Sequence, residues 1–146
     1  MIKKASKVDC KIWLSPPHMS GFEQEFINDA FKNNWIAPLG PNVDGFENDI
    51  SNYLNENTHT AALVSGTAAI HLALILLNVG QGDEVICQTK TFIASVNPVM
   101  YLGAKPILVD SERETWNLCP VLLEKTIKDR ITLGTKPKAI IVINLY

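Results

Sequence analysis

A short run of small residues, Ser65-Gly66-Thr67-Ala68, has the composition of a phosphate-binding turn. An apolar stretch that suits a buried strand precedes it, and an apolar stretch of helical length follows it. The first backbone amides of a helix have no acceptor inside the helix and carry the positive end of its dipole. Gly66 would let a ligand approach the backbone closely, and the hydroxyls of Ser65 and Thr67 could add hydrogen bonds. This arrangement is suited to an anion such as phosphate.

A purely structural role explains the same turn equally well. Ser65 or Thr67 could cap the helix, and Gly66 could simply make the turn between strand and helix. The spacing is neither G-x-G-x-x-G nor G-x-x-x-x-G-K-[ST], so the sequence excludes dinucleotide-binding and Walker-type loops. From these residues alone, phosphate binding and helix capping both stay open.

The other reactive side chains are isolated. The three cysteines, Cys10, Cys87 and Cys119, are far apart and form no C-x-x-C or His/Cys cluster, so no metal site is predicted. Their number and spacing fit the reducing cytosol, and we expect unreactive thiols and a cytoplasmic location. His71 falls among apolar helix residues and is predicted to pack rather than to act as an acid or base.

Apolar periodicity predicts the elements that position this turn. Residues 1–18 are expected to be an N-terminal segment, residues 19–57 a helical segment and residues 58–146 a partial α/β domain. A capping box, Ser20-Gly21-Phe22-Glu23, opens the helical segment, and the prolines of Ala37–Pro41 break it. Short apolar runs then alternate with helices, which predicts a largely parallel sheet whose strands are buried on both sides by helices. The expected helices cover 20–34, 43–54, 67–77, 92–102 and 121–129, and the expected strands 60–64, 83–87, 106–109 and 138–143.

The composition restricts the partners of the chain. Its 146 residues are 47% hydrophobic and 19% charged, with a formal net charge of −2, as in a globular protein. Acidic and basic residues are interspersed, so no electrostatic footprint for nucleic acid or an anionic membrane is present. No stretch is long and apolar enough to predict a membrane span.

Several spaced motifs, taken together, resemble the DegT/DnrJ/EryC1/StrS family of pyridoxal-phosphate-dependent nucleotide-sugar aminotransferases. They occur in one order, and the resemblance covers nearly the whole chain from about Ile12. These motifs are Leu39-Gly40-Pro41, Phe46-Glu47, Ser65 to Leu74, Gly82 to Ile86, Thr91 to Ser95, Gly103 to Pro106, Asp110 and Asn144-Leu145-Tyr146. The resemblance implies the large domain of a fold-type I pyridoxal-phosphate enzyme and, for the full-length protein, a homodimer.

The resemblance also implies a cofactor site for pyridoxal 5′-phosphate. Gly66, Thr67 and Ala68, next to Ser65, would hold the phosphate through backbone amides and the Thr67 hydroxyl. Phe92 would stack on the pyridine ring, where an aromatic face contributes about 0.5–1.5 kcal/mol beyond area burial. The reaction implied is transfer of an amino group from a donor, expected to be glutamate, to a nucleotide-linked keto sugar.

The resemblance places the Schiff-base lysine beyond Tyr146, so no catalytic residue is assigned in this chain. Lys90 lies in a polar stretch where it should be solvated and protonated, whereas such a lysine needs a lowered pKa. The end of the chain just after a strand predicts an N-terminal fragment without activity of its own. Two alternatives stay open: a sugar dehydratase of the same family, with histidine in place of the lysine, and a non-catalytic interaction module.

Overall fold

The computed structural model describes residues 15–55 and 57–145, and the chain divides into two compact units after Ala62. The first unit contains two helices, α1 (Glu23–Lys32) and α2 (Pro41–Leu54). The second unit contains all the strands. Its elements, in chain order, are α3 (Gly66–Leu76), β1 (Glu84–Gln88), the 3₁₀ turn η1 (Ile93–Ser95), α4 (Asn97–Tyr101), β2 (Lys105–Val109), α5 (Pro120–Thr132) and β3 (Ala139–Ile141).

The predicted capping box of the first helix forms only in part. The Glu23 carboxylate accepts hydrogen bonds from the Ser20 and Gly21 amides, at 2.6 and 2.9 Å, and from the Ser20 hydroxyl. These bonds, chiefly that from the Ser20 amide, lower the pKa of Glu23 to about 2. Phe22 occupies the N-cap position without a side-chain capping bond, so α1 begins at Glu23 rather than at residue 20.

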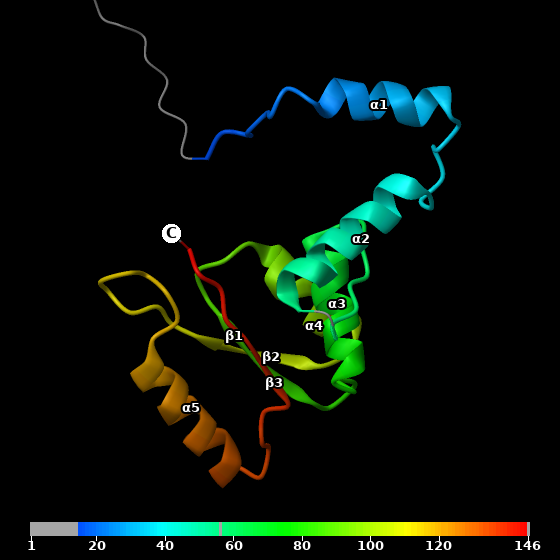
Figure 1. Cartoon of the computed structure of the whole chain (residues 1–146). Helices are drawn as coiled ribbons and strands as arrows, with labels where there is room; N and C mark the ends of the chain where they lie inside the picture. Colours follow the sequence, from blue (N-terminus) through cyan, green and yellow to red (C-terminus); the bar gives the residue numbers. More distant parts are fainter. Residues whose placement is uncertain (1–14, 56, 146) are drawn as a thin grey trace, which may run out of the picture. The chain divides into compact units, whose positions relative to one another are not determined.

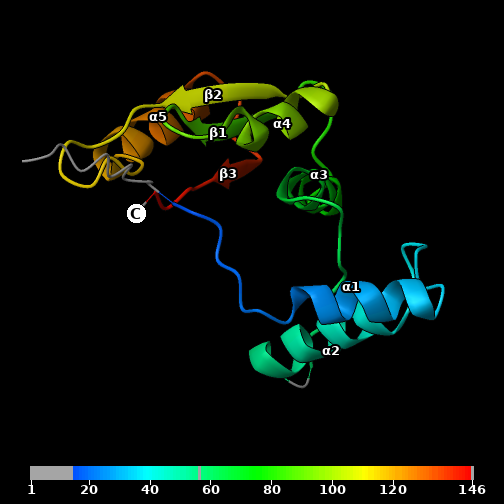
Figure 2. The same cartoon turned by 90° about the horizontal axis from the view of Figure 1, so that it is seen from above.

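The three strands form one parallel sheet in the order β2-β1-β3, which confirms the predicted sheet type. Figure 1 shows α5 on one side of this sheet and α3 and α4 on the other, so helices cover both faces as expected. Figure 2 shows the strands side by side with β1 in the middle. Every residue of β1 is buried.

Alternation along β1 divides the core between the two faces of the sheet. Val85 and Cys87 pack with Leu74, Val79, Val99 and Ala104 on the side of α3 and α4. The intervening Ile86 packs with Val109 and Leu118 on the side of α5. Because side chains alternate along a strand, Glu84 and Gln88 lie on the same side of β1 as Ile86.

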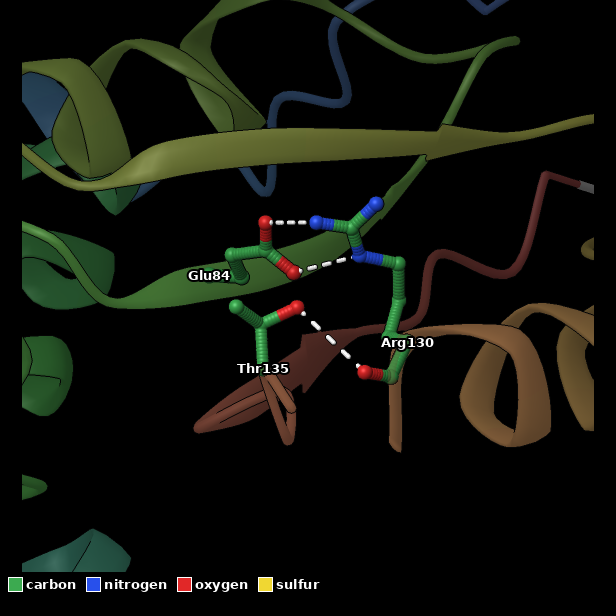
Figure 3. Close-up of polar contacts among 3 residues, drawn as sticks. All are labelled: Glu84, Arg130 and Thr135. Carbon is green, nitrogen blue, oxygen red and sulfur yellow. Dashed lines mark hydrogen bonds and ion pairs between the residues drawn. The ribbon is translucent and has the colours of Figure 1, made fainter. Parts of the chain in front are cut away.

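A nearly buried ion pair joins β1 to α5 (Figure 3). The Glu84 carboxylate is 6% exposed and accepts hydrogen bonds from the Nε and Nη2 atoms of Arg130. The Thr135 hydroxyl donates to the carbonyl of Arg130 at 3.3 Å and so holds the end of the helix. Paired with a guanidinium, Glu84 has a lowered pKa, and burial opposes that shift only in part.

The expected strand at 60–64 does not form. The Ala62 amide donates to the Glu47 carboxylate at 2.7 Å, and the Thr60 hydroxyl accepts a hydrogen bond from Ser51. Val64 is 95% exposed, and residues 60–64 take part in neither the described sheet nor the described isolated bridge. A strand needs a neighbour to complete its ladder, and apolar sequence alone cannot supply one.

Two further expectations need correction. The single helix expected at 92–102 is divided into η1 and α4, because Pro98 has no amide to continue a helix that begins earlier. In α4 the same proline occupies the first turn, where its missing donor costs nothing.

The expectation that every strand is buried on both sides is also wrong. Only the central β1 is buried throughout, while β2 and β3 have partly exposed side chains because each lies at an edge of this sheet.

Candidate functional site

The N-terminus of α3 leaves two backbone amides available to a ligand. Ser65 is the N-cap residue, and its Oγ accepts a hydrogen bond from the Ala68 amide at 3.2 Å. Its carbonyl accepts from the Ala69 amide at 3.0 Å. Among the described residues no acceptor bonds the amides of Gly66 and Thr67. The capping role of Ser65 is therefore observed, and it leaves the next two amides unpaired.

Open space surrounds Gly66. A Cβ atom added there would meet no other atom within 4 Å, so the turn does not need glycine for its own packing. Room for an anion therefore exists beside the unpaired amides. The Thr67 side chain is half-buried, and its hydroxyl makes no hydrogen bond to another described residue. The turn thus fits a bound phosphate.

The path of the chain brings this turn to the edge of the sheet that carries Phe92. Helix α3 and strand β1 each span about 16 Å and are joined by the short segment 77–83. Leu74, near the end of α3, and Val79, just after it, pack in the same core as Val85 of β1, so the helix runs back along the strand. The start of α3 therefore lies toward the carboxyl end of β1. The contact between α3 and η1 agrees with this placement.

Phe92 presents its ring to solvent. It precedes η1, and its carbonyl accepts a hydrogen bond from the Ser95 amide at 2.9 Å. The side chain is 87% exposed and contributes to neither core cluster. Among the described residues, Phe92 is therefore not part of the hydrophobic core. The ring is free to cover a flat ligand.

Lys90 is placed differently from the prediction. Its Nζ lies 3.0 Å from the centroid of the Trp116 ring, and the residue is half-buried rather than fully solvated. A cation over an indole face is a favourable arrangement for a charged ammonium. That Lys90 is not the cofactor-bearing lysine stays a prediction.

The remaining reactive groups have packing roles. The His71 ring meets the ring of Tyr101 edge to face, with centroids 5.6 Å apart, as expected for a packing histidine. Cys87 is fully buried, and desolvation raises the pKa of its thiol to about 11. Cys119 is a free, half-buried thiol, whereas Cys10 lies outside the described residues. The described ranges contain no group of three or more potential metal ligands.

A loop at the same edge of the sheet was not anticipated from the sequence. Residues 111–118 close on themselves through a bridge between Ser111 and Leu118. The Glu112 carboxylate holds the loop by accepting from the amides of Glu114 and Thr115, at 2.7 and 2.6 Å. Beside the loop lies a shallow cavity of about 460 Å³, lined by Lys90, Asp110, Ser111, Glu112, Arg113 and Trp116.

One buried polar residue connects this loop to the segment before Phe92. Gln88 is only 1% exposed, and its Nε2 donates to the carbonyl oxygens of Lys90 and Trp116. The only sequence signal is a glutamine at the end of an apolar run, which by itself does not distinguish a site from a strand end.

Comparison with known proteins matches these elements to one family. The sequence profile of the DegT/DnrJ/EryC1/StrS aminotransferase family matches residues 17–146. The chain is 53% identical over 136 residues to the "Putative pyridoxal phosphate-dependent aminotransferase EpsN" of Bacillus subtilis (strain 168), covering 93% of this chain and 35% of that protein. It is 39% identical to the GDP-perosamine synthase of Escherichia coli O157:H7, covering 89% of this chain and 34% of that enzyme.

Solved structures give the same result. The "Putative sugar aminotransferase Spr1654 from Streptococcus pneumoniae, PMP-form" superposes with a TM-score of 0.75 and 34% identity, covering 92% of this chain and 32% of that one. The chain therefore spans about a third of the length of the relatives it matches. In the part of the chain that the structure describes, no helix combines the length and apolarity needed to cross a membrane.

Proposed function

We propose, since this chain belongs to the DegT/DnrJ/EryC1/StrS aminotransferase family, that it supplies phosphate and ring contacts for pyridoxal phosphate in a sugar aminotransferase. The observation that carries the proposal is the pair of unpaired amides at Gly66 and Thr67, at the same sheet edge as the exposed ring of Phe92. A phosphate and an aromatic ring are the two parts of this cofactor that such groups recognise.

Hydrogen bonds dominate the proposed phosphate contact. The Gly66 and Thr67 amides and the Thr67 hydroxyl would donate to the phosphate oxygens, and each bond to a charged group contributes about 1.5–3 kcal/mol. The dipole of α3 adds about 0.3–1 kcal/mol. The Ala68 amide, which the family resemblance implied as a third donor, is already bonded to Ser65. It would join only if that capping bond opened.

The bound cofactor would carry an amino group from a donor, proposed to be glutamate, to the carbonyl carbon of a nucleotide-linked keto sugar. Support for a nucleotide sugar comes from the similarity to a GDP-perosamine synthase. The described residues of this chain would bind and orient the cofactor. With the Lys90 ammonium placed over Trp116, we also propose that residues 1–146 alone do not transfer amino groups. Glutamate-dependent turnover by these residues alone would disprove that point.

A homodimer in the cytoplasm completes the proposal. The apolar side chains of Phe22, at the N-cap of α1, and of Phe26 and Phe31 within the helix are more than half exposed, which supports an interface on the first unit. The free thiols of Cys87 and Cys119 are compatible with a reducing compartment. Light scattering on the full-length protein tests the dimer, since a monomeric mass at micromolar concentration would contradict it.

Binding of pyridoxamine 5′-phosphate to the full-length protein tests the proposed site directly. By calorimetry, Thr67→Val should weaken binding about tenfold or more, because it removes one hydrogen bond to a charged group. Thr67→Ser keeps the hydroxyl and should bind within about threefold of the wild type, a change of under 1 kcal/mol. Equal affinity of the wild type and Thr67→Val would contradict the proposed phosphate contact.

A further inference from the structure

The exposed ring of Phe92 depends on its backbone for its position. Phe92 is 87% exposed, so core packing does not fix the orientation of its ring. The backbone of the segment from Gln88 to Ser95 must therefore orient it. We propose that Gln88 is a positioning residue for the cofactor ring, acting through the turn that presents Phe92. This inference rests on the proposed function, because it presupposes that Phe92 stacks on the pyridine.

Gln88 fixes the start of that turn from inside the protein. Its Nε2 donates to the Lys90 carbonyl at 3.1 Å and to the Trp116 carbonyl at 3.3 Å. One amide group thereby holds the residue two positions ahead and the separate loop of residues 111–118. The strand ladder continues as far as Thr89, whose amide donates to Val109 at 3.0 Å. After Thr89 the backbone makes no further strand hydrogen bonds among the described residues, and the bond from the Gln88 side chain to the Lys90 carbonyl holds it instead.

The other end of the turn is anchored independently. The hydroxyls of Thr91 and Ser95 share a hydrogen bond of 2.9 Å, and Ser95 is only 6% exposed. The Ser95 amide donates to the Phe92 carbonyl, which closes the 3₁₀ turn. The part-buried hydroxyl pair thus spans Phe92, and the bonds of Gln88 hold the backbone just before it. Loss of either anchor would leave its ring with a wider range of orientations.

Stability alone gives a poor explanation for a glutamine at this position. Its Oε1 is buried and has no hydrogen-bond partner among the described residues, and burial of an unsatisfied acceptor is unfavourable. An apolar side chain of similar volume would avoid that penalty. The two carbonyls that Gln88 bonds belong to a half-buried and an exposed residue, so water could replace the lost donor. The bonds of Nε2 are therefore the feature that the glutamine contributes.

The Trp116 side chain can be separated from its carbonyl. Trp116 has a φ of 64°, a left-handed conformation that glycine adopts more readily than other residues. Trp116→Gly therefore removes the ring over Lys90 and keeps the carbonyl that Gln88 bonds. It serves as the matched control, because it changes the loop without removing the Gln88 hydrogen bond.

The test is a double-mutant cycle in the full-length protein, with pyridoxamine 5′-phosphate as the titrant. Phe92→Ala should weaken binding roughly two- to tenfold. Gln88→Met should keep the wild-type melting temperature or raise it, and should weaken binding by a similar or smaller factor. In the Phe92→Ala background, Gln88→Met should cause no further loss, because the ring it aims is gone. Trp116→Gly should bind within about twofold of the wild type.

Two results would overturn the inference while leaving the proposed function intact. One is wild-type affinity for Gln88→Met alongside weakened binding for Phe92→Ala. The other is a double variant whose loss is the product of the two single losses. Gln88→Leu, which also lacks the donor and introduces no charge, should repeat the loss of affinity if the methionine variant fails to fold. If Phe92→Ala binds as tightly as the wild type, ring stacking and this inference both fail.

Discussion

At the scale of single residues, a substitution at Gly66 distinguishes what folding requires from what ligand binding requires. Nothing in the protein lies within 4 Å of the position of an added Cβ, and the residue begins a helix, where alanine is favoured over glycine. Gly66→Ala should therefore leave the melting temperature unchanged or slightly higher. Its methyl group would lie where a phosphate approaches the amides, so affinity for pyridoxamine phosphate should fall. Thermal unfolding and calorimetry on the same sample measure both effects.

A contrary result at Gly66 is informative. Unchanged affinity in a stable Gly66→Ala protein would mean that no ligand approaches this turn closely. The capping alternative for Ser65-Gly66-Thr67 would then suffice.

Cys87 is predicted to be inert. Its fully buried thiol has a pKa raised to about 11, so almost no thiolate is present at pH 8. A Cys10→Ser, Cys119→Ser variant should react with a thiol reagent only after denaturation. Rapid labelling of the native variant at pH 8 would show that the strand opens or that the thiol is accessible.

At the scale of elements, the link between Glu84 and Arg130 fixes α5 to β1. Glu84→Gln should lower the melting temperature, because it leaves a guanidinium without its partner. The matched control is Lys128→Ala, which breaks the exposed ion pair with Glu124 and should change stability by no more than about 0.5 kcal/mol. Equal effects of the two substitutions would contradict the structural role of the nearly buried pair.

The pH dependence of this link has a definite sign. The folded pKa of Glu84 lies below its unfolded value of about 4.3, so the stabilisation is fully present above that value. It is lost as the pH falls through the folded pKa. The stability difference between the wild type and Glu84→Gln should therefore be constant near neutral pH and shrink below about pH 4. Urea unfolding over this range would measure it, and a difference that grows on acidification would refute it.

Local pattern predicted most elements but not their interactions with distant parts of the chain. The apolar run Val85-Ile86-Cys87 is sufficient to predict a buried central strand. Residues 60–64 carry a similar signal, yet a strand requires a neighbour, which local sequence does not reveal. Pro98 could have predicted the division of 92–102, because its missing amide forbids a continuous helix. The role of Gln88 depends on a loop 28 residues away and had no local signal.

At the scale of the whole molecule, family resemblance and geometry contribute different parts of the account. The ordered motifs predicted the family, which the match over residues 17–146 confirms. Capping by Ser65 and phosphate binding, which the sequence left as alternatives, are compatible. Ser65 caps with its hydroxyl while the next two amides stay unpaired. The described chain corresponds to about a third of its relatives, so the reaction itself belongs to the proposal.

The central claim is that the start of α3 binds the cofactor phosphate while Phe92 contacts the ring. The most direct test compares the affinity of the full-length protein for pyridoxamine 5′-phosphate and for pyridoxamine, which lacks the phosphate. Thr67→Val should weaken only the phosphorylated ligand, whereas Phe92→Ala should weaken both by a similar factor. If Thr67→Val weakened both ligands equally, or neither, the assignment of the phosphate to this turn would be wrong.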